Sequence, residues 1–249
     1  MNFYIAHILD SSLDRISLYN VTDKNCSKKI LNSISDLEKI NDAESLLVLI
    51  PSSEVTSYAF NKNESLSEQI NIANFISDVD TNFIDSVSDN EYFLKNDAAF
   101  IVNKTFLVNL NQHLSSLSYK VFVTPEYLIN INKNSDVITE IDNKFMFSYK
   151  TNYGFSVHGE SLNQYLDLVT NNNPNYEPKI FSSNKELNKR FKSVNDDHEF
   201  NFADVNRDIV SSLPNFFKIN MSVGFLVKKN EFFKITNINY IHSNVIFNW

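Results

Sequence analysis

Residues 46–55 read LLVLIPSSEV, and this stretch carries the most information about the fold. The five consecutive apolar residues from Leu46 to Ile50 predict a strand that is covered on both faces, because a half-exposed strand would alternate apolar and polar residues. Pro51-Ser52-Ser53 ends this strand. A second strand is expected over Glu54 to Phe60, where the apolar and aromatic residues resume.

The residues before this stretch predict a hairpin and a short helix. Phe3 to Leu9 and Arg15 to Val21 have the composition of two strands, and the turn over Asp10 to Asp14 joins them. Asp10 is the first residue of this turn and directly follows the first strand. Ser33 to Ile40 predicts a short helix.

Three later segments predict amphipathic helices, because apolar residues recur in them every three or four positions. The first opens at Ser65, with Glu68 three residues later as in a capping box. The second covers Lys104 to Leu117, the third covers Glu160 to Val169, and a short charged helix is expected over Asn184 to Val194. The predicted apolar stripes are Leu66, Ile70, Ala73 and Ile76; then Leu107, Leu110, Leu114 and Leu117; then Leu162, Tyr165, Leu166 and Val169.

The remaining strands complete a mixed sheet pattern. Ala98 to Val102 and Tyr119 to Val123 flank the second helix, so we expect them to form a parallel pair with a right-handed crossover. A three-strand meander and one edge strand follow at Val137 to Ile141, Lys144 to Lys150, Tyr153 to His158 and Lys179 to Phe181. The order of elements therefore predicts an α/β (α+β) fold with mixed sheets flanked by helices.

Composition argues against nucleotide and nucleic-acid chemistry. The 249 residues contain only three glycines, Gly154, Gly159 and Gly224, and none stands in a phosphate-binding loop. The 30 acidic and 22 basic residues give a net charge of −8, whereas nucleic-acid binding needs clustered lysine and arginine. We therefore expect no nucleic-acid partner and no bound cofactor.

The side chains that usually build catalytic or metal sites are scattered. No two of the five histidines have a metal-ligand spacing, and the cluster Asp196-Asp197-His198-Glu199 is expected to be a solvated loop. His7 is in phase with the apolar residues of the first strand, which predicts a hydrogen-bonded core histidine. The single cysteine, Cys26, excludes an internal disulfide. The sequence predicts no catalytic residue and no metal ligand.

One stretch is acidic and free of basic residues. Its carboxylates belong to Asp78, Asp80, Asp85, Asp89 and Glu91. A solvated surface is one interpretation of this pattern. A protein interface is the other, because apolar residues interrupt the run and like charges can steer a basic partner.

No run approaches the roughly 18 apolar residues of a membrane-spanning helix. The N-terminal residues MNFYIAH also lack the basic and apolar regions of a signal peptide, so we expect none.

The order of these patterns resembles general secretion pathway protein L, the inner-membrane component of the type II secretion machine. The resemblance begins with residues 46–55, followed by a strand, a helix and the acidic stretch. It continues through residues 98–102, the leucine-rich helix and residues 121–126, which read VFVTPE. The segment 149–155 and the helix 162–169 are similar to the family's Gly-Phe strand pair and its next leucine helix. In all, the resemblance covers residues 1–205 in order.

The resemblance implies a fold of degenerate actin-like lobes of the RNase H type. Residues 1–125 would form a first lobe with an inserted strand-helix-strand subdomain, 126–210 a second lobe, and 211–249 a divergent C-terminal segment. The implied role is a non-enzymatic adaptor at the cytoplasmic face of the bacterial inner membrane. Its implied partners are the N-terminal domain of the secretion ATPase, other inner-membrane platform components and a second copy of the chain, and the acidic run is the candidate partner surface.

The chain departs from the family at its C-terminal end. The family continues into a transmembrane helix and a periplasmic domain, whereas this sequence reaches Trp249 without an apolar span. Two alternatives stay open from the residues. One is an actin-like ATPase of the pilus assembly type that uses Asp10 with Mg²⁺, and the other is an unrelated α+β structural protein with a similar order of elements.

Overall fold

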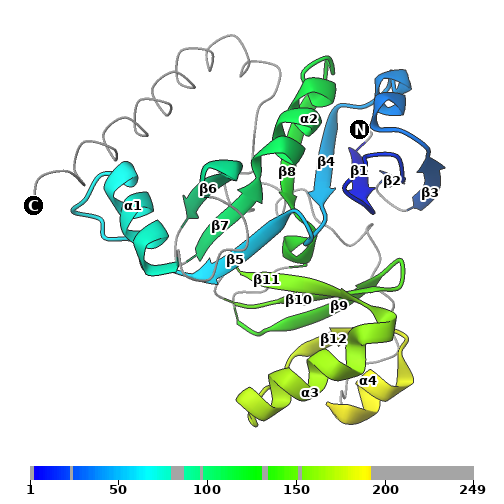
Figure 1. The fold of residues 1–249 in the computed structure, drawn as a ribbon. Helices are drawn as coiled ribbons and strands as arrows, with labels where there is room; N and C mark the ends of the chain where they lie inside the picture. Colours follow the sequence, from blue (N-terminus) through cyan, green and yellow to red (C-terminus); the bar gives the residue numbers. More distant parts are fainter. Residues whose placement is uncertain are drawn as a thin grey trace, which may run out of the picture.

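The computed structural model describes residues 3–22, 25–79, 87–95, 98–130, 134–150 and 153–191. Their strands form three sheets, which we call the first sheet, the small sheet and the second sheet in chain order (Figure 1). Residues 222–227 and 231–238, whose sequence suggests two strands that pair across residues 228–230, lie outside the described residues, as does the cluster 196–199. Within the described ranges, no helix is both long and apolar enough to cross a membrane.

The first sheet has the strand order β3-β2-β1-β4-β8. Its strands are β1 (Phe3–Ile8), β2 (Ile16–Val21), β3 (Cys26–Leu31), β4 (Ser45–Ile50) and β8 (Lys120–Pro125). β2 runs antiparallel to both of its neighbours, whereas β4 and β8 run parallel to β1. Counted along the chain within this sheet, the strand order is 3-2-1-4-5. The predicted hairpin of β1 and β2 is confirmed, and β3 is a strand that the sequence patterns missed.

β4 lies inside the first sheet and is covered on both faces. Its five residues from Leu46 to Ile50 are all 0% exposed, which confirms the strand predicted from the apolar run. The helix α2 (Lys104–Leu114) packs its predicted leucine stripe into the same core. The 3-10 helix η1 (Ile34–Lys39) stands where a short helix was expected, and the side chain of Ser33 caps it.

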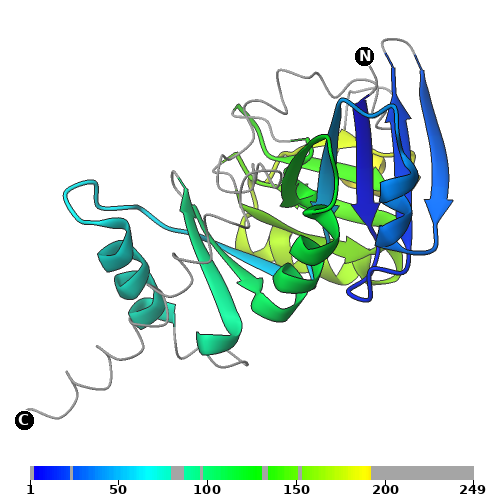
Figure 2. The ribbon, with the colours of Figure 1, turned by 90° about the horizontal axis from the view of Figure 1, so that it is seen from above.

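The small sheet, β5-β7-β6, is fully antiparallel and projects from the side of the molecule opposite to β1–β3 (Figures 1 and 2). It consists of β5 (Val55–Ala59), β6 (Asn90–Lys95) and β7 (Ala98–Asn103). The predicted parallel pair of β7 and β8 is therefore wrong, because β7 joins β5 and β6 while β8 pairs with β4. The strand-helix-strand pattern predicts a crossover connection, but it does not show which sheet each of the two strands joins.

The helix α1 (Glu68–Val79) covers the small sheet with a different face from the one predicted. Ser67 accepts the first hydrogen bond, from the Ile70 N–H at 3.3 Å, so the capping box at Ser65 is wrong. Asn71 and Phe75 are the buried residues, while Ile70 is 48% exposed. Buried Asn71 hydrogen-bonds the backbone of Asn63 and the residues after it, which rotates the helix away from its most apolar stripe.

The second sheet repeats the topology of the first. Its order is β11-β10-β9-β12, an antiparallel meander whose first strand pairs in parallel with a fourth. The strands are β9 (Val137–Ile141), β10 (Lys144–Ser148), β11 (Gly154–His158) and β12 (Lys179–Phe181). The predicted meander and edge strand are thus confirmed.

Helices cover the far face of the second sheet (Figure 1). A 3-10 turn, η5 (Gly159–Ser161), leads into α3 (Leu162–Asn172), and α4 (Lys185–Arg190) follows β12. Phe145 and Phe147 of β10 point into the core under these helices, whereas Met146 belongs to the core of the first sheet. β10 therefore serves two hydrophobic cores, one on each face. Tyr165, which was expected in the α3 stripe, is 40% exposed and packs beside Phe155.

Gly154 is the glycine on which this arrangement depends. A Cβ at this position would lie 2.1 Å from the backbone oxygen of Phe147 and 2.9 Å from the Tyr127 ring. The Gly154 N–H and carbonyl also contact the Ser57 hydroxyl at 3.0 and 2.9 Å, which links β11 to β5 of the small sheet. The absence of a side chain lets β11 come this close to Phe147 and to the Tyr127 ring.

We predict that Gly154→Ala lowers the free energy of unfolding by roughly 3 kcal/mol, because the new methyl group meets backbone that cannot move aside. Gly159→Ala is the matched control, since its Cβ would meet only the side-chain end of Asn143. Urea unfolding of both variants measures the difference. Equal losses in the two variants would show that the close approach at Gly154 is not the cause.

Candidate functional site

The first and second sheets meet at a buried carboxylate, Glu126. It is the first residue of the 3-10 helix η4 (Glu126–Leu128) and directly follows Pro125, where β8 ends. Ile50 pairs with Pro125 in the parallel ladder, so the chain leaves β4 and β8 at the same edge of the sheet. In open α/β sheets this carboxyl edge of the strands is where ligands usually bind.

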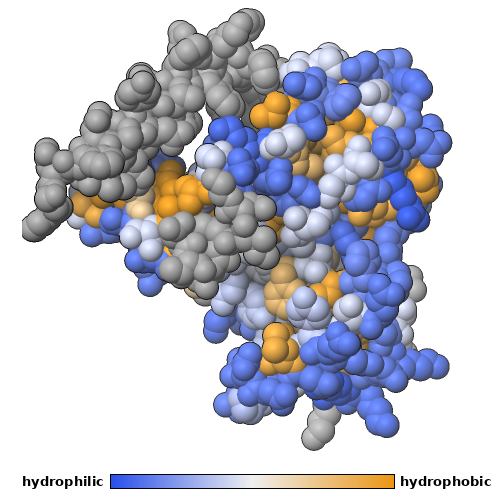
Figure 3. Space-filling model, in the orientation of Figure 1, coloured by the Kyte–Doolittle hydropathy of each residue, from blue (hydrophilic) through white to orange (hydrophobic). Residues whose placement is uncertain are grey.

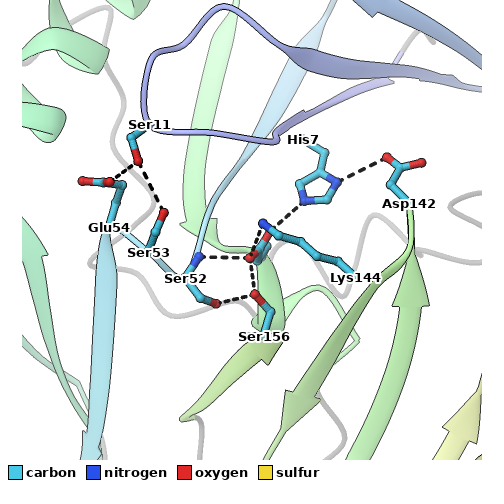
Figure 4. A network of polar contacts seen from close by, with 9 residues as sticks. His7, Ser11, Ser52, Ser53, Glu54, Asp142, Lys144 and Ser156 are labelled. Carbon is cyan, nitrogen blue, oxygen red and sulfur yellow. Dashed lines mark hydrogen bonds and ion pairs between the residues drawn. The ribbon is translucent and has the colours of Figure 1, made fainter. Parts of the chain in front are cut away.

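Four donors from four different segments converge on Glu126. His7 Nε2 of β1 lies 2.7 Å from Oε2, and the Ser52 N–H after β4 donates to Oε1 at 2.9 Å. Lys144 Nζ, from the start of β10, lies 3.0 Å from both oxygens. The Ser156 hydroxyl of β11 donates to Oε1 and also lies 2.8 Å from Ser52 Oγ (Figure 4).

The partners decide the charge of Glu126. Burial alone would raise the pKa of its carboxyl group, because a buried charge loses its hydration. The hydrogen bond and charge of His7, the Lys144 ammonium and the Ser156 hydroxyl outweigh this effect and lower the pKa to about 2. Glu126 is therefore a carboxylate at every physiological pH, although its side chain is 0% exposed.

Asp142 brings a second carboxylate to the same interface. It stands with Asn143 in the two-residue turn between β9 and β10, and both have positive φ, 55° and 59°, as a type I′ turn requires. The Tyr19 hydroxyl donates to Asp142 Oδ2 at 2.8 Å, and Lys28 forms an ion pair with Oδ1. His7 Nδ1 lies 3.6 Å from Oδ2, which is an ion-pair distance (Figure 4).

These contacts hold Asp142 ionised and keep Tyr19 protonated. Burial would raise the pKa of Asp142, but the nearby His7 ring, the Lys28 ammonium and the hydrogen bond from Tyr19 depress it well below the usual range. Burial, followed by the Asp142 charge, raises the pKa of Tyr19 far above its ordinary value. The turn of the second sheet is thus bound to β1, β2 and β3 of the first sheet.

The turn between β1 and β2 makes a separate polar contact. Ser11 hydrogen-bonds Glu54 and lies 3.4 Å from Ser53 Oγ, which joins this turn to the segment after β4 (Figure 4). The carboxylate of Asp10 accepts from the Ser12 N–H at 3.2 Å and from the Ser12 hydroxyl at 2.7 Å. Asp10, the residue considered for Mg²⁺ binding, is therefore engaged within its own turn.

The chemistry of this arrangement is that of a structural clamp. A general base needs a pKa near the working pH and access to a substrate proton, whereas Glu126 is fully buried with a pKa of about 2. Phosphate binding needs backbone N–H groups that are free to face the ligand, whereas the Ser52 N–H is used by Glu126. In the described part of the chain, no group of three His, Cys, Asp or Glu residues could hold a metal ion.

The structure describes three of the five residues of the predicted acidic surface. Asp78, near the end of α1, and Asp89, in the 3-10 helix η3 (Val87–Asp89), are both exposed. Glu91 of β6 is half-buried and forms an ion pair with Lys104 at 3.8 Å. Asp80 and Asp85 lie outside the described residues.

The site residues were largely missed by the sequence patterns. The prediction that His7 is a hydrogen-bonded core residue is confirmed, but its partner Glu126 lies 119 residues away. Glu126 was recognised only as the end of a strand. Lys144 is the one site residue with a signal in the sequence, because a lysine stands beside the apolar residues of the strand KFMFS. In the structure this lysine is only 7% exposed.

Comparison with known proteins gives the fold of the chain. No protein-family model matches the sequence. No curated protein matches it either. Among solved structures, the chain is similar to the cytoplasmic domain of EpsL, an inner membrane component of the type II secretion system of Vibrio cholerae. The TM-score is 0.57 at 16% identity, and the match covers 73% of this chain and 82% of that one. The chain therefore has the mixed α/β fold of that domain, as its sequence predicted.

We predict that Glu126→Gln lowers the free energy of unfolding by roughly 3 to 5 kcal/mol, because it leaves two buried cationic groups without their counter-charge. Chemical denaturation at pH 7 measures this loss. Glu160→Gln, an exposed carboxylate in η5, is the control and is expected to change stability by less than about 0.5 kcal/mol. A similarly small effect for Glu126→Gln would contradict the clamp.

Proposed function

We propose that this chain is a cytoplasmic component of a bacterial type II secretion machine, held at the inner-membrane platform. Two independent lines support the proposal. The fold is shared with the EpsL cytoplasmic domain over 73% of the chain. The order of sequence patterns over residues 1–205 resembles general secretion pathway protein L, which is the family of such platform components.

Within that machine we propose a non-enzymatic adaptor role. The observation that carries it is the occupation of the sheet interface by the protein's own side chains. At the carboxyl edge of β1, β4 and β8, where a ligand would be expected, the Glu126 carboxylate already binds His7, Ser52 and Lys144. The two turns at this interface, residues 10–14 and 142–143, contain no glycine. Such turns suit a fixed scaffold better than a phosphate-binding site.

The proposed partner is the N-terminal domain of the secretion ATPase, which the adaptor would recruit to the membrane platform. Of the candidate partner surface, the structure describes Asp78, Asp89 and Glu91, and the carboxylates of Asp78 and Asp89 are exposed. Hydrophobic surface lies beside hydrophilic surface in the region of α1, where Ile70 is 48% exposed (Figure 3). Apolar contact area with surrounding negative charge is suited to a partner that presents a basic rim.

A binding titration tests the adaptor role. The chain is titrated with the N-terminal domain of the secretion ATPase encoded in the same genome, and we expect a Kd of about 1 μM or tighter that ATP does not change. A thermal shift with ATP and Mg²⁺ is run beside it. A nucleotide at about 100 times its Kd would stabilise the fold by about 2.7 kcal/mol, and we expect no such shift. Nucleotide binding without ATPase binding would instead favour the actin-like ATPase alternative.

Charge reversal tests the partner surface separately. Asp78→Lys combined with Asp89→Lys should weaken ATPase binding and flatten its dependence on salt, because long-range attraction between the partners is lost. Glu160→Lys combined with Glu177→Lys changes the net charge equally at two exposed positions, one in η5 and one just before β12, and is the matched control. If both double variants bind like the wild type, the acidic surface is not the contact.

A further inference from the structure

Both ring nitrogens of His7 face carboxylates. Nε2 lies 2.7 Å from Glu126 Oε2, and Nδ1 lies 3.6 Å from Asp142 Oδ2. A neutral imidazole has one N–H and one lone pair, so it would direct a lone pair at one of the two carboxylates. Only the doubly protonated ring presents an N–H to each of them. Nδ1 makes no hydrogen bond at 3.6 Å, and the Asp142 charge beside it favours the charged form of a residue that is 0% exposed.

The other groups around His7 do not change which protonation state of the ring is favoured. Its ladder partners, Ser17 on β2 and Leu49 on β4, carry no charge. Lys144 on β10 opposes protonation, but its ammonium is shared between both Glu126 oxygens. Lys28 on β3 binds the far oxygen of Asp142 and does not face the ring directly. The cluster thus holds two carboxylates beside one histidine, with Lys144 paired to Glu126 and Lys28 paired to Asp142.

The two carboxylates belong to different parts of the fold. His7 is part of the first sheet, Glu126 lies on the connection that leaves it, and Asp142 is in the β9–β10 turn of the second sheet. Protonation of one ring therefore changes the contact between two sheets. We propose that His7 is the pH-sensitive element of a latch that joins the β9–β10 turn to the first sheet. The latch is closed when both nitrogens carry protons and loosens when Nδ1 loses its proton.

The expected pH range follows from the direction of the shift. Burial lowers the pKa of His7, but the Asp142 carboxylate beside Nδ1 and the hydrogen bond to Glu126 outweigh burial and raise the pKa above 6.5. A raised folded pKa means that the stabilisation is complete below about 6.5 and is lost as pH rises through the folded value. The neutral ring can keep its Nε2–H bond to Glu126. Asp142 then retains only Tyr19 and Lys28, so the turn loosens without detaching.

Stability measured against pH tests the latch. Urea unfolding of the wild type and His7→Gln is followed from pH 5.5 to 9, because glutamine can still donate to Glu126 but does not titrate. Relative to the variant, the unfolding constant of the wild type should increase by up to tenfold per pH unit above 6.5, until the folded pKa is passed. His158→Gln, an exposed histidine of β11, should leave the wild-type pH profile unchanged. Parallel profiles for the wild type and His7→Gln would overturn the proposal.

A direct titration keeps the proposal testable if His7→Gln does not fold. The His7 ring is followed by NMR in the wild type and in Asp142→Asn, which removes the carboxylate that faces Nδ1. We expect a pKa above 6.5 in the wild type and a lower one in the variant. Amide exchange at residues 142–144, corrected for intrinsic rate, should accelerate several-fold between pH 6 and 9 in the wild type only. A wild-type His7 that titrates below 6.5 would refute the latch.

Discussion

Burial of the Glu126 carboxylate is the constraint on which the rest of the structure depends. An isolated carboxylate in a protein interior costs several kcal/mol, so it persists only where donors surround it. Here the donors come from β1, the end of β4, β10 and β11, and each must stay in place for the others to be satisfied. The relative position of the two larger sheets is therefore specified by charge and hydrogen bonding as well as by hydrophobic contact.

The hydrophobic packing also connects the two larger sheets, because β10 contributes side chains to two cores. β10 directs Met146 toward the core of the first sheet and Phe145 and Phe147 toward α3 and α4. Lys144 continues the Met146 side of the strand and reaches Glu126, so the ionic cluster is an extension of the first core. The two larger sheets share one strand order. The side chains at the interface between them, such as His7 from the first sheet and Lys144 from the second, are of different types. The shared strand order describes the two larger sheets, and the polar cluster explains how they are joined.

This organisation connects the fold to the proposed role. In an actin-like enzyme the contact between the lobes would have to open around a nucleotide. In this chain the carboxyl edges of β1, β4 and β8 are closed by internal ion pairs, so the two sheets can present a constant surface to protein partners. The proposed latch adds a limited adjustment to this scaffold, because only the Asp142 contact depends on the second proton of His7. A scaffold with one adjustable contact is compatible with recruitment of a partner and does not require turnover.

The sequence by itself determined the elements whose signal is local. The apolar run of β4, the leucine stripe of α2 and the strands of the β9–β10–β11 meander were predictable, because hydrophobic periodicity depends on neighbouring residues. Only the tertiary structure decided that β8 joins β4 and not β7, and that α1 buries Asn71 in place of its apolar stripe. It alone also brought His7 to Glu126, across 119 residues. Strand partners and buried ion pairs are selected by the competition of distant segments for the same space, and a local pattern contains no measure of that competition.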